Sequence, residues 1–296
     1  MKFSNIAELL LLAAVWGGSF LFMRIAAPII GPVWLIEIRV LLAGLIMLLV
    51  VTRQGQLYLL RKYWFPLAVV GCINSAIPFV FLAFASVYLP AGFTSILNGT
   101  APLFGMIVAS VWLNERLTPT RLIGFALGFV GVVLLVGLRE VAVTSTFFLA
   151  VSAGLMAAIM YAIAAPYIKQ QMTGVPSFVT TTGSQLAAAL VLVPLLPFTI
   201  PQNPITPPVI IAVLALALLS TALAYVLYFR LIQNVGSTKA LTVTYLIPFF
   251  AMLWGALILK EPITSSMIGG CALVLLGTAI VNDVLTSRFN HQSRDR

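Results

Sequence analysis

Glu37 and Arg39 are the charged residues of an otherwise apolar stretch, GPVWLIEIRVLLAGLIMLLV, at residues 31–50. A charge near the centre of a bilayer costs about 2.5–3.5 kcal/mol on insertion scales. Two residues apart on a helix, their side chains point about 200° away from each other and do not pair. Arg39 suits binding of a carboxylate in a central cavity, or contact with outer headgroups or a helix end. Glu37 suits proton coupling, or solvation at the membrane interface, or a salt bridge to Arg24 or another basic group.

Uncharged polar residues and aromatic residues form a second group of candidates. Buried amides and hydroxyls in an apolar segment must find partners, either on neighbouring helices or in a polar cavity. Aromatic rings in such segments either pack or form the wall of a cavity. The candidates for a substrate cavity are Trp16, Arg39, Asn74, Phe79, Asn98, Tyr161, Gln185, Tyr225, Thr244 and Tyr245. Pro78, Pro102 and Pro248 each remove a backbone hydrogen bond and are expected to kink the helices that carry them.

Catalytic chemistry has few candidate residues in this chain. The seven acidic residues are scattered, and no two form an acid–base dyad. His291, the single histidine, lies in a polar tail, and Cys72 and Cys271 lie in apolar runs, so no metal site is expected. None of the lysines follows a phosphate-binding loop. We therefore expect neither an enzyme nor an ATP-driven pump, and no cofactor.

The composition indicates the elements that position these residues. Of the 296 residues 61% are apolar and 8% are charged, whereas a soluble domain carries about 25% charged residues. The stretches 63–114 and 170–229 contain no charged residue, and each is long enough for two helical spans. The alternating pattern of a barrel is absent. The basic residues, which give a net charge of +9, fall mostly between apolar runs and indicate membrane topology, not nucleic-acid binding.

We predict an all-α polytopic membrane protein with ten transmembrane helices. Turn residues separate the apolar runs, for example Gly31-Pro32 and the proline-rich TIPQNPITPP. The third and fourth spans are expected to meet in a tight hairpin. The predicted spans are 5–26, 33–51, 65–88, 91–113, 121–138, 147–168, 177–198, 208–229, 238–259 and 263–284.

The two halves of the chain repeat each other at an offset of 146 residues. APLFGMIVASVWLNERLTPTRLIGFALGFVG begins at Ala101, and IPFFAMLWGALILKEPITSSMIGGCALVLLG begins at Ile247. We predict a first five-helix repeat over 1–140, a second over 147–285 and a polar cytoplasmic tail over 286–296. The matched pairs include Pro102 with Pro248, Glu115 with Glu261, Arg39 with Gln185, and, after a shift of one residue, Trp16 with Tyr161 and Arg24 with Lys169.

Several repeated residues predict structural contacts. Gly124, Gly128 and Gly131 share one side of the fifth span, and small residues let helices approach closely. They predict packing within the scaffold or a homodimer contact. Glu115 and Glu261 are expected to cap helices or to pair with neighbours such as Arg121.

An odd number of helices per repeat places the second repeat upside down. With the N-terminus in the cytoplasm, twelve Lys and Arg residues lie inside and three outside, as the positive-inside rule requires. Both termini are then cytoplasmic, and the repeats are inverted. This inversion places Arg39 and Gln185 at opposite ends of a pathway across the membrane. We expect them to be paired positions that either gate the pathway or pack its ends. Inverted repeats are typical of alternating-access carriers.

Four stretches carry a resemblance to a known family. They are WGGSFLFMR, IEIRVLLAG, Pro102 followed by NERLTPTRLIGFALGFVGV, and Pro248 followed by LKEPITSSMIGGCALVLLGTAIV. The chain resembles the EamA-type transporters of the drug/metabolite transporter superfamily. The resemblance implies a multi-pass secondary carrier of the bacterial inner membrane. Many members resemble exporters of amino acids and related metabolites, and others move nucleosides, polyamines, cofactors or drugs.

We therefore expect export of a small, amino acid-like metabolite by alternating access. Arg39 and nearby aromatic rings suit a carboxylate that carries an apolar side chain. Uptake or exchange of another metabolite is the alternative, and a non-transporting membrane subunit is a further one. The expected partners are a small-molecule substrate and the lipid bilayer, with a homodimer as a further expectation and no nucleic acid.

Overall fold

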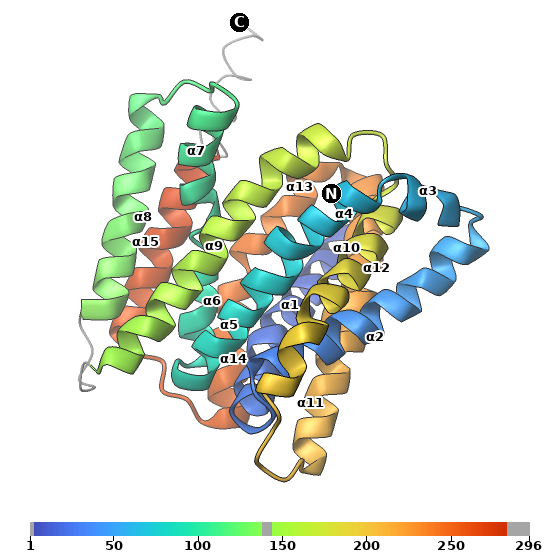
Figure 1. Cartoon of the computed structure of the whole chain (residues 1–296). Helices are drawn as coiled ribbons and strands as arrows, with labels where there is room; N and C mark the ends of the chain where they lie inside the picture. Colours follow the sequence, from blue (N-terminus) through green and yellow to red (C-terminus); the bar gives the residue numbers. More distant parts are fainter. Residues whose placement is uncertain (1–2, 138–143, 283–296) are drawn as a thin grey trace, which may run out of the picture.

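The computed structural model describes residues 3–137 and 144–282, and all regular elements in these ranges are helical (Figure 1). Outside the described residues lie Arg139, the predicted tail 286–296 and the terminal residues of both predicted repeats. Among the described helical segments, eight are long and apolar enough to cross a membrane. Two further apolar helices, Ile247–Leu259 and Ser265–Val281, are shorter. The chain is therefore an all-helical polytopic membrane protein.

The first half begins with two long helices and continues with shorter ones. A π-helical turn, Cys72–Ala76, joins α4 to α5, and we call it the first π-turn. Leu89 and Pro90 separate α5 from α6, so the predicted tight hairpin is present. The helices are α1 (Phe3–Ile30), α2 (Pro32–Arg53), α3 (Leu57–Lys62), α4 (Trp64–Gly71), α5 (Ile77–Tyr88), α6 (Ala91–Asn98), α7 (Ala101–Trp112) and α8 (Pro119–Gly137).

The second half has the same order of elements. A second π-turn, Leu218–Leu223, joins α11 to α12. Its first residue lies 146 positions after Cys72, because 218 − 72 = 146. Tight 3₁₀ turns cover Val193–Phe198 and Leu241–Tyr245. The helices are α9 (Ser145–Gln171), α10 (Ser177–Leu192), α11 (Pro207–Ala217), α12 (Ala224–Val235), α13 (Ser237–Ala240), α14 (Ile247–Leu259) and α15 (Ser265–Val281).

The three prolines expected to kink helices lie where helical segments restart. Pro102 and Pro248 occupy the first turns of α7 and α14, after breaks in the fourth and ninth predicted spans. A first helical turn tolerates proline because its N–H groups lack intrahelical partners. Pro78 lies at the start of α5, directly after the first π-turn. The helical segments fall on all ten predicted ranges, while a membrane crossing by each of the ten stays a prediction.

Glycines hold α8 and α15 together along their length. A Cβ atom added at Gly124 would lie 2.8 Å from the carbonyl oxygen of Gly277, and one at Gly131 would lie 2.9 Å from that of Gly270. Because carbon and oxygen do not approach this closely, only glycine permits the contact. The glycine face of α8 is thus used within the chain. A homodimer stays a prediction and would have to use another surface.

Figure 1 separates the two ends of the helix bundle. One end holds α3, α13 and the α7–α8 and α9–α10 connections, and we call it the basic face. The other end, the opposite face, holds the α1–α2 turn and the α10–α11 and α14–α15 connections. The segments at or next to the basic face carry Arg53, Arg61, Lys62, Arg116, Arg121, Lys169, Arg230 and Lys239.

Candidate functional site

A central cavity of about 680 Å³ lies between segments of both halves. Two of the prolines, Pro102 and Pro248, also line it, while Pro78 and Gln185 do not. The structure thus brings most of the predicted cavity residues together. Their role in substrate binding stays a prediction. The predicted residues that line the cavity are Trp16, Arg39, Asn74, Phe79, Asn98, Tyr161, Tyr225, Thr244 and Tyr245.

The cavity opens toward the basic face. Its exposed lining residues include Leu241 and Thr244, which follow α13, and Asn282, at the end of α15. Asn282 Nδ2 donates a hydrogen bond to the Tyr245 hydroxyl at 2.9 Å beside this mouth. Toward the opposite face the lining is buried, and Met23 is only 1% exposed. The cavity is therefore accessible from one side of the bundle.

Arg39 is a buried cation in the wall of this cavity. Its Nε donates to Thr221 Oγ1 at 2.9 Å, and its guanidinium carbon lies 3.9 Å from the centre of the Phe79 ring. Tyr161 and Tyr225 line the same cavity. No carboxylate in the described part of the chain forms an ion pair with Arg39. Since a buried charge without a counter-ion is costly, the site is suited to receive an anion.

Gln185 makes the equivalent contact in the other half. Its side chain is fully buried, and Nε2 donates to Ser75 Oγ at 3.2 Å. The two contacts match residue for residue, because 185 − 39 = 146 and 221 − 75 = 146. Both hydroxyls lie in π-turns, and Thr221 donates onward to the Leu216 carbonyl, five residues back. Since its proton goes to Leu216, the Thr221 oxygen is free to accept from Arg39.

Glu37 lies outside the cavity lining. It is 5% exposed, and its Oε2 has no hydrogen-bond partner among the described residues. The expected salt bridge between Glu37 and Arg24 is wrong, because Arg24 pairs with Glu261 at 3.2 Å. Sequence spacing could not reveal this pairing, since it joins α1 to the α14–α15 connection.

The Arg24–Glu261 pair closes the opposite face. Arg24 Nη1 also donates to the carbonyl oxygens of Ser86 at 3.0 Å and Val87 at 2.6 Å, in the last turn of α5. Glu261 Oε2 accepts from the Ala91 N–H, at the start of α6, at 2.9 Å. The expected capping and pairing role of Glu261 is confirmed. One ion pair thus ties α1, the α5–α6 hairpin and the α14–α15 connection together.

The basic face lacks the equivalent closure. Glu115, the repeat partner of Glu261, pairs with Arg121 at 3.3 Å, as predicted, and stays within its own connection. Lys169, the repeat partner of Arg24, is exposed and forms no ion pair with a described carboxylate. Among the described residues, the pair equivalent to Arg24–Glu261 is therefore formed at the opposite face and not at the basic face, where the cavity opens.

Further polar residues complete the cavity lining, and of these only Tyr228 was expected from the sequence, as part of an aromatic wall. Hydroxyl residues are common on packed membrane helices, so their type alone does not reveal which way they face. The matched positions of Ser75 and Thr221 were a signal available in the repeat. The additional polar lining residues are Ser19, Ser95, Ser220, Tyr228, Thr242, Thr278 and Asn282.

Known proteins match this chain over almost its whole length. An uncharacterized transporter of Archaeoglobus fulgidus is 24% identical over 276 residues, which cover 92% of this chain and 96% of that protein. A probable amino-acid metabolite efflux pump of Salmonella typhimurium is 26% identical, with 92% of each chain covered. A crystal structure at 18% identity shares the fold, with a TM-score of 0.66 and coverage of 98% of this chain and 99% of that one. The EamA-like transporter family matches residues 5–137 and 148–283, and the chain belongs to this family, within the drug/metabolite transporter superfamily.

Proposed function

We propose that the chain is a secondary carrier that exports a small, amino acid-like metabolite from the cytoplasm by alternating access. In this proposal ten helices cross the bacterial inner membrane as two inverted repeats, over 1–140 and 147–285. The basic face and both termini are cytoplasmic, in agreement with the positive-inside rule.

Reciprocal contacts support the inverted repeats. Gly124 faces Gly277 and Gly131 faces Gly270, while the offset relates Gly124 to Gly270 and Gly131 to Gly277. Each helix of the pair thus presents the same two positions to its partner in crossed order, as a two-fold axis between α8 and α15 requires. The Arg39–Thr221 and Gln185–Ser75 contacts obey the same relation.

The buried guanidinium of Arg39, which has no carboxylate partner among the described residues, is the observation that carries the substrate class. A carboxylate in the cavity would neutralise it through charge-assisted hydrogen bonds, each of which contributes about 1.5–3 kcal/mol. Aromatic and apolar lining residues such as Trp16, Phe79 and Leu82 suit the apolar side chain of such a substrate. A polycation would meet an uncompensated positive charge instead, so polyamines fit this cavity poorly.

The open mouth and the closed opposite face support loading from the cytoplasm, which is the first step of export. A cavity that opens at the basic face loads from the cytoplasm, and the Arg24–Glu261 pair then has to break for release. The Salmonella typhimurium relative, a probable amino-acid metabolite efflux pump, supports the same direction.

Counterflow in liposomes tests the proposal. Purified protein is reconstituted into vesicles preloaded with single amino acids, nucleosides or polyamines, and entry of the labelled compound is followed. Arg39→Ala and Arg39→Lys are compared with Arg53→Ala, which removes an exposed cation from the same helix. We expect an apolar amino acid to exchange, Arg39→Ala to weaken its binding by about 10–100-fold, and Arg53→Ala to behave as the parent.

Two results would contradict the proposal. Exchange of cationic or neutral compounds alone would remove the amino-acid assignment. Normal exchange by a folded Arg39→Ala protein would make Arg39 a structural residue, and the substrate class would then have no support in the cavity.

A further inference from the structure

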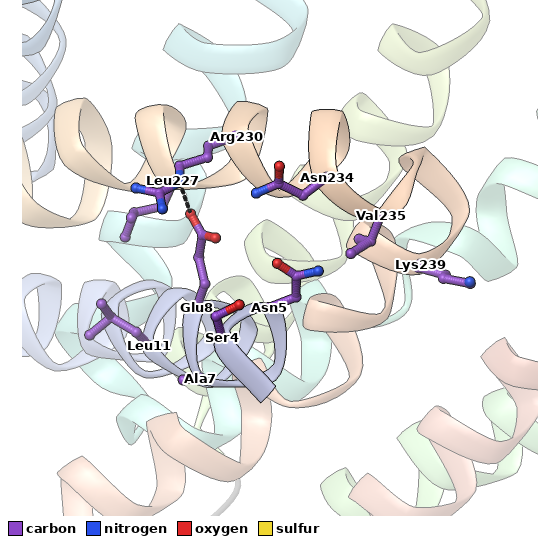
Figure 2. Close-up of a pocket in the computed structure, with 10 residues that line it drawn as sticks. All are labelled: Ser4, Asn5, Ala7, Glu8, Leu11, Leu227, Arg230, Asn234, Val235 and Lys239. Atoms are coloured by element: carbon purple, nitrogen blue, oxygen red, sulfur yellow. Dashed lines mark ion pairs between the residues drawn. The ribbon is translucent and has the colours of Figure 1, made fainter. Parts of the chain in front are cut away.

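A second pocket, separate from the central cavity, lies between α1 and α12 near the basic face (Figure 2). Its volume is about 760 Å³, and none of its lining residues lines the central cavity. The transport proposal does not use it. The lining residues are Ser4, Asn5, Ala7, Glu8, Leu11, Leu227, Arg230, Asn234, Val235 and Lys239.

An opposite-charge pair lies at the centre of the pocket. Glu8 Oε1 and Arg230 Nε are 3.4 Å apart, and the side chains are 11% and 70% exposed respectively. The contact lacks hydrogen-bond geometry, and the buried Oε1 has no other hydrogen-bond partner among the described residues. An N–H donor in the pocket can therefore reach Glu8 only through the 11% of its side chain that is exposed, while most of the Arg230 side chain remains available to an anion.

Polar groups surround this pair. Asn5 and Asn234 face each other across the gap between α1 and α12, and Lys239 lies at the edge of the pocket (Figure 2). Their amide and ammonium groups can donate to phosphate oxygens. The pocket thus offers one acceptor for a cation and several donors for an anion within a short distance.

The deeper end of the pocket is apolar and continues onto the outer surface of the bundle. Leu11, in the lining, is 51% exposed, and the neighbouring Leu10 is 44% exposed. On α12 and the turn before it, Val226 is 40% and Leu223 is 41% exposed. In a membrane these side chains contact acyl chains. A ligand with a charged head and an apolar tail fits both ends of the pocket.

We propose that this pocket binds the headgroup of a phospholipid that carries a primary ammonium, of the ethanolamine type, from the leaflet at the basic face. The ammonium donates to Glu8, and the phosphate accepts from Arg230 and Asn234. An anionic glycerol headgroup would bring no positive charge to Glu8 beyond that of Arg230, and a trimethylammonium headgroup has no N–H to donate. The free phosphoethanolamine group shares the polar chemistry but lacks the tail.

Native mass spectrometry of the full chain, released from detergent after lipid titration, tests the site. Dioleoyl phosphatidylethanolamine is compared with the phosphatidylcholine and phosphatidylglycerol of the same chains, and with water-soluble glycerophosphoethanolamine. We expect one saturable ethanolamine lipid, bound about tenfold or more tightly than either other lipid, since one charge-assisted hydrogen bond separates them. Glycerophosphoethanolamine is expected to compete poorly.

Matched substitutions locate the bound lipid. Glu8→Gln is expected to abolish the preference for ethanolamine over choline, while Glu115→Gln, which changes the same charge at the same face, retains it. Equal retention of the three lipids by the parent protein would overturn the proposal without any variant. Tight binding of glycerophosphoethanolamine would overturn the lipid assignment. Because binding is measured without transport, failure here leaves the transport proposal untouched.

Discussion

The Nε atom of Arg39 lies 2.9 Å from the hydroxyl oxygen of Thr221, and this bond joins α2 of the first half to the second π-turn. Its counterpart joins Gln185 to Ser75. The two contacts are the same by position and differ in charge. Only the first holds a cation in the cavity wall.

Thr221→Val is expected to raise the KM for the substrate by about tenfold, because Arg39 loses the bond that orients it. Valine keeps the shape of threonine and removes the hydroxyl. Ser75→Ala is the matched control, since it breaks the counterpart contact outside the cavity. It should lower the melting temperature and leave KM unchanged. Counterflow kinetics and thermal unfolding measure both, and equal KM values for the two variants would contradict an orienting role for Thr221.

Glu261→Gln should weaken the closure of the opposite face, because it removes the charge that pairs with Arg24 and caps α6. We expect the protein to spend more time open on that side. A cysteine placed at the buried Met23, in a background without Cys72 and Cys271, reports this opening through its labelling by a membrane-impermeant maleimide. Labelling from the opposite face should increase several-fold. An unchanged rate would mean that other contacts keep that face closed.

Lys169 and Glu115 are expected to pair in the alternate state, when the basic face closes. The repeat relates them to Arg24 and Glu261, with the Ser237 N–H in the place of the Ala91 N–H, since 237 − 91 = 146. Lys169→Ala should therefore slow exchange without weakening substrate binding in the present state. Arg61→Ala, at the same face, serves as the control. Exchange at the parental rate in Lys169→Ala would remove this pair from the mechanism.

Gly124→Ala is expected to destabilise the protein by about 1–3 kcal/mol, because the added Cβ meets the Gly277 carbonyl oxygen at 2.8 Å. Gly105→Ala is the control within the same half, since nothing lies within 4 Å of its added Cβ. Alanine there should stabilise α7 by up to about 1 kcal/mol through its higher helix propensity. Thermal unfolding in one detergent compares the two, and equal melting temperatures would show that α8 and α15 separate easily.

Glu37→Gln tests proton coupling. Glutamine keeps the shape of the carboxyl but cannot bind and release a proton, so accumulation driven by a pH gradient should disappear. Counterflow without a gradient should persist. Both are measured in the same liposomes, and gradient-driven accumulation by Glu37→Gln at the parental rate would assign Glu37 a structural role.

Apolar run length and turn residues predicted the helical ranges well. The offset of 146 residues matched Arg39 with Gln185, and the structure shows that these two residues make equivalent contacts, with Thr221 and Ser75. The π-turns were not predicted, because Cys72–Ala76 and Leu218–Leu223 contain no proline or glycine that marks a break. Their extra residue per turn depends on packing between helices.

The types of residue in the site could be predicted from the sequence more readily than the direction in which each side chain points. Nine of the predicted residues meet in one cavity, since polar and aromatic residues in membrane helices gather where water or ligand is present. Gln185 and Glu37 show the limit. Whether a buried polar side chain turns toward the cavity or toward a neighbouring helix is set by helix rotation, which one sequence does not reveal.

The crossed glycine contacts between α8 and α15 have a mechanical consequence. Interchanging the halves turns Gly124–Gly277 into Gly270–Gly131, and both contacts exist already. An interface that a two-fold rotation carries onto itself favours neither orientation, so α8 and α15 can stay fixed while the remaining helices move. The Arg24–Glu261 bridge has no such twin and therefore biases the resting orientation. Substitutions that disrupt the α8–α15 interface should shorten the lifetime of the folded protein. Substitutions in the Arg24–Glu261 pair should instead change which side of the membrane the cavity faces.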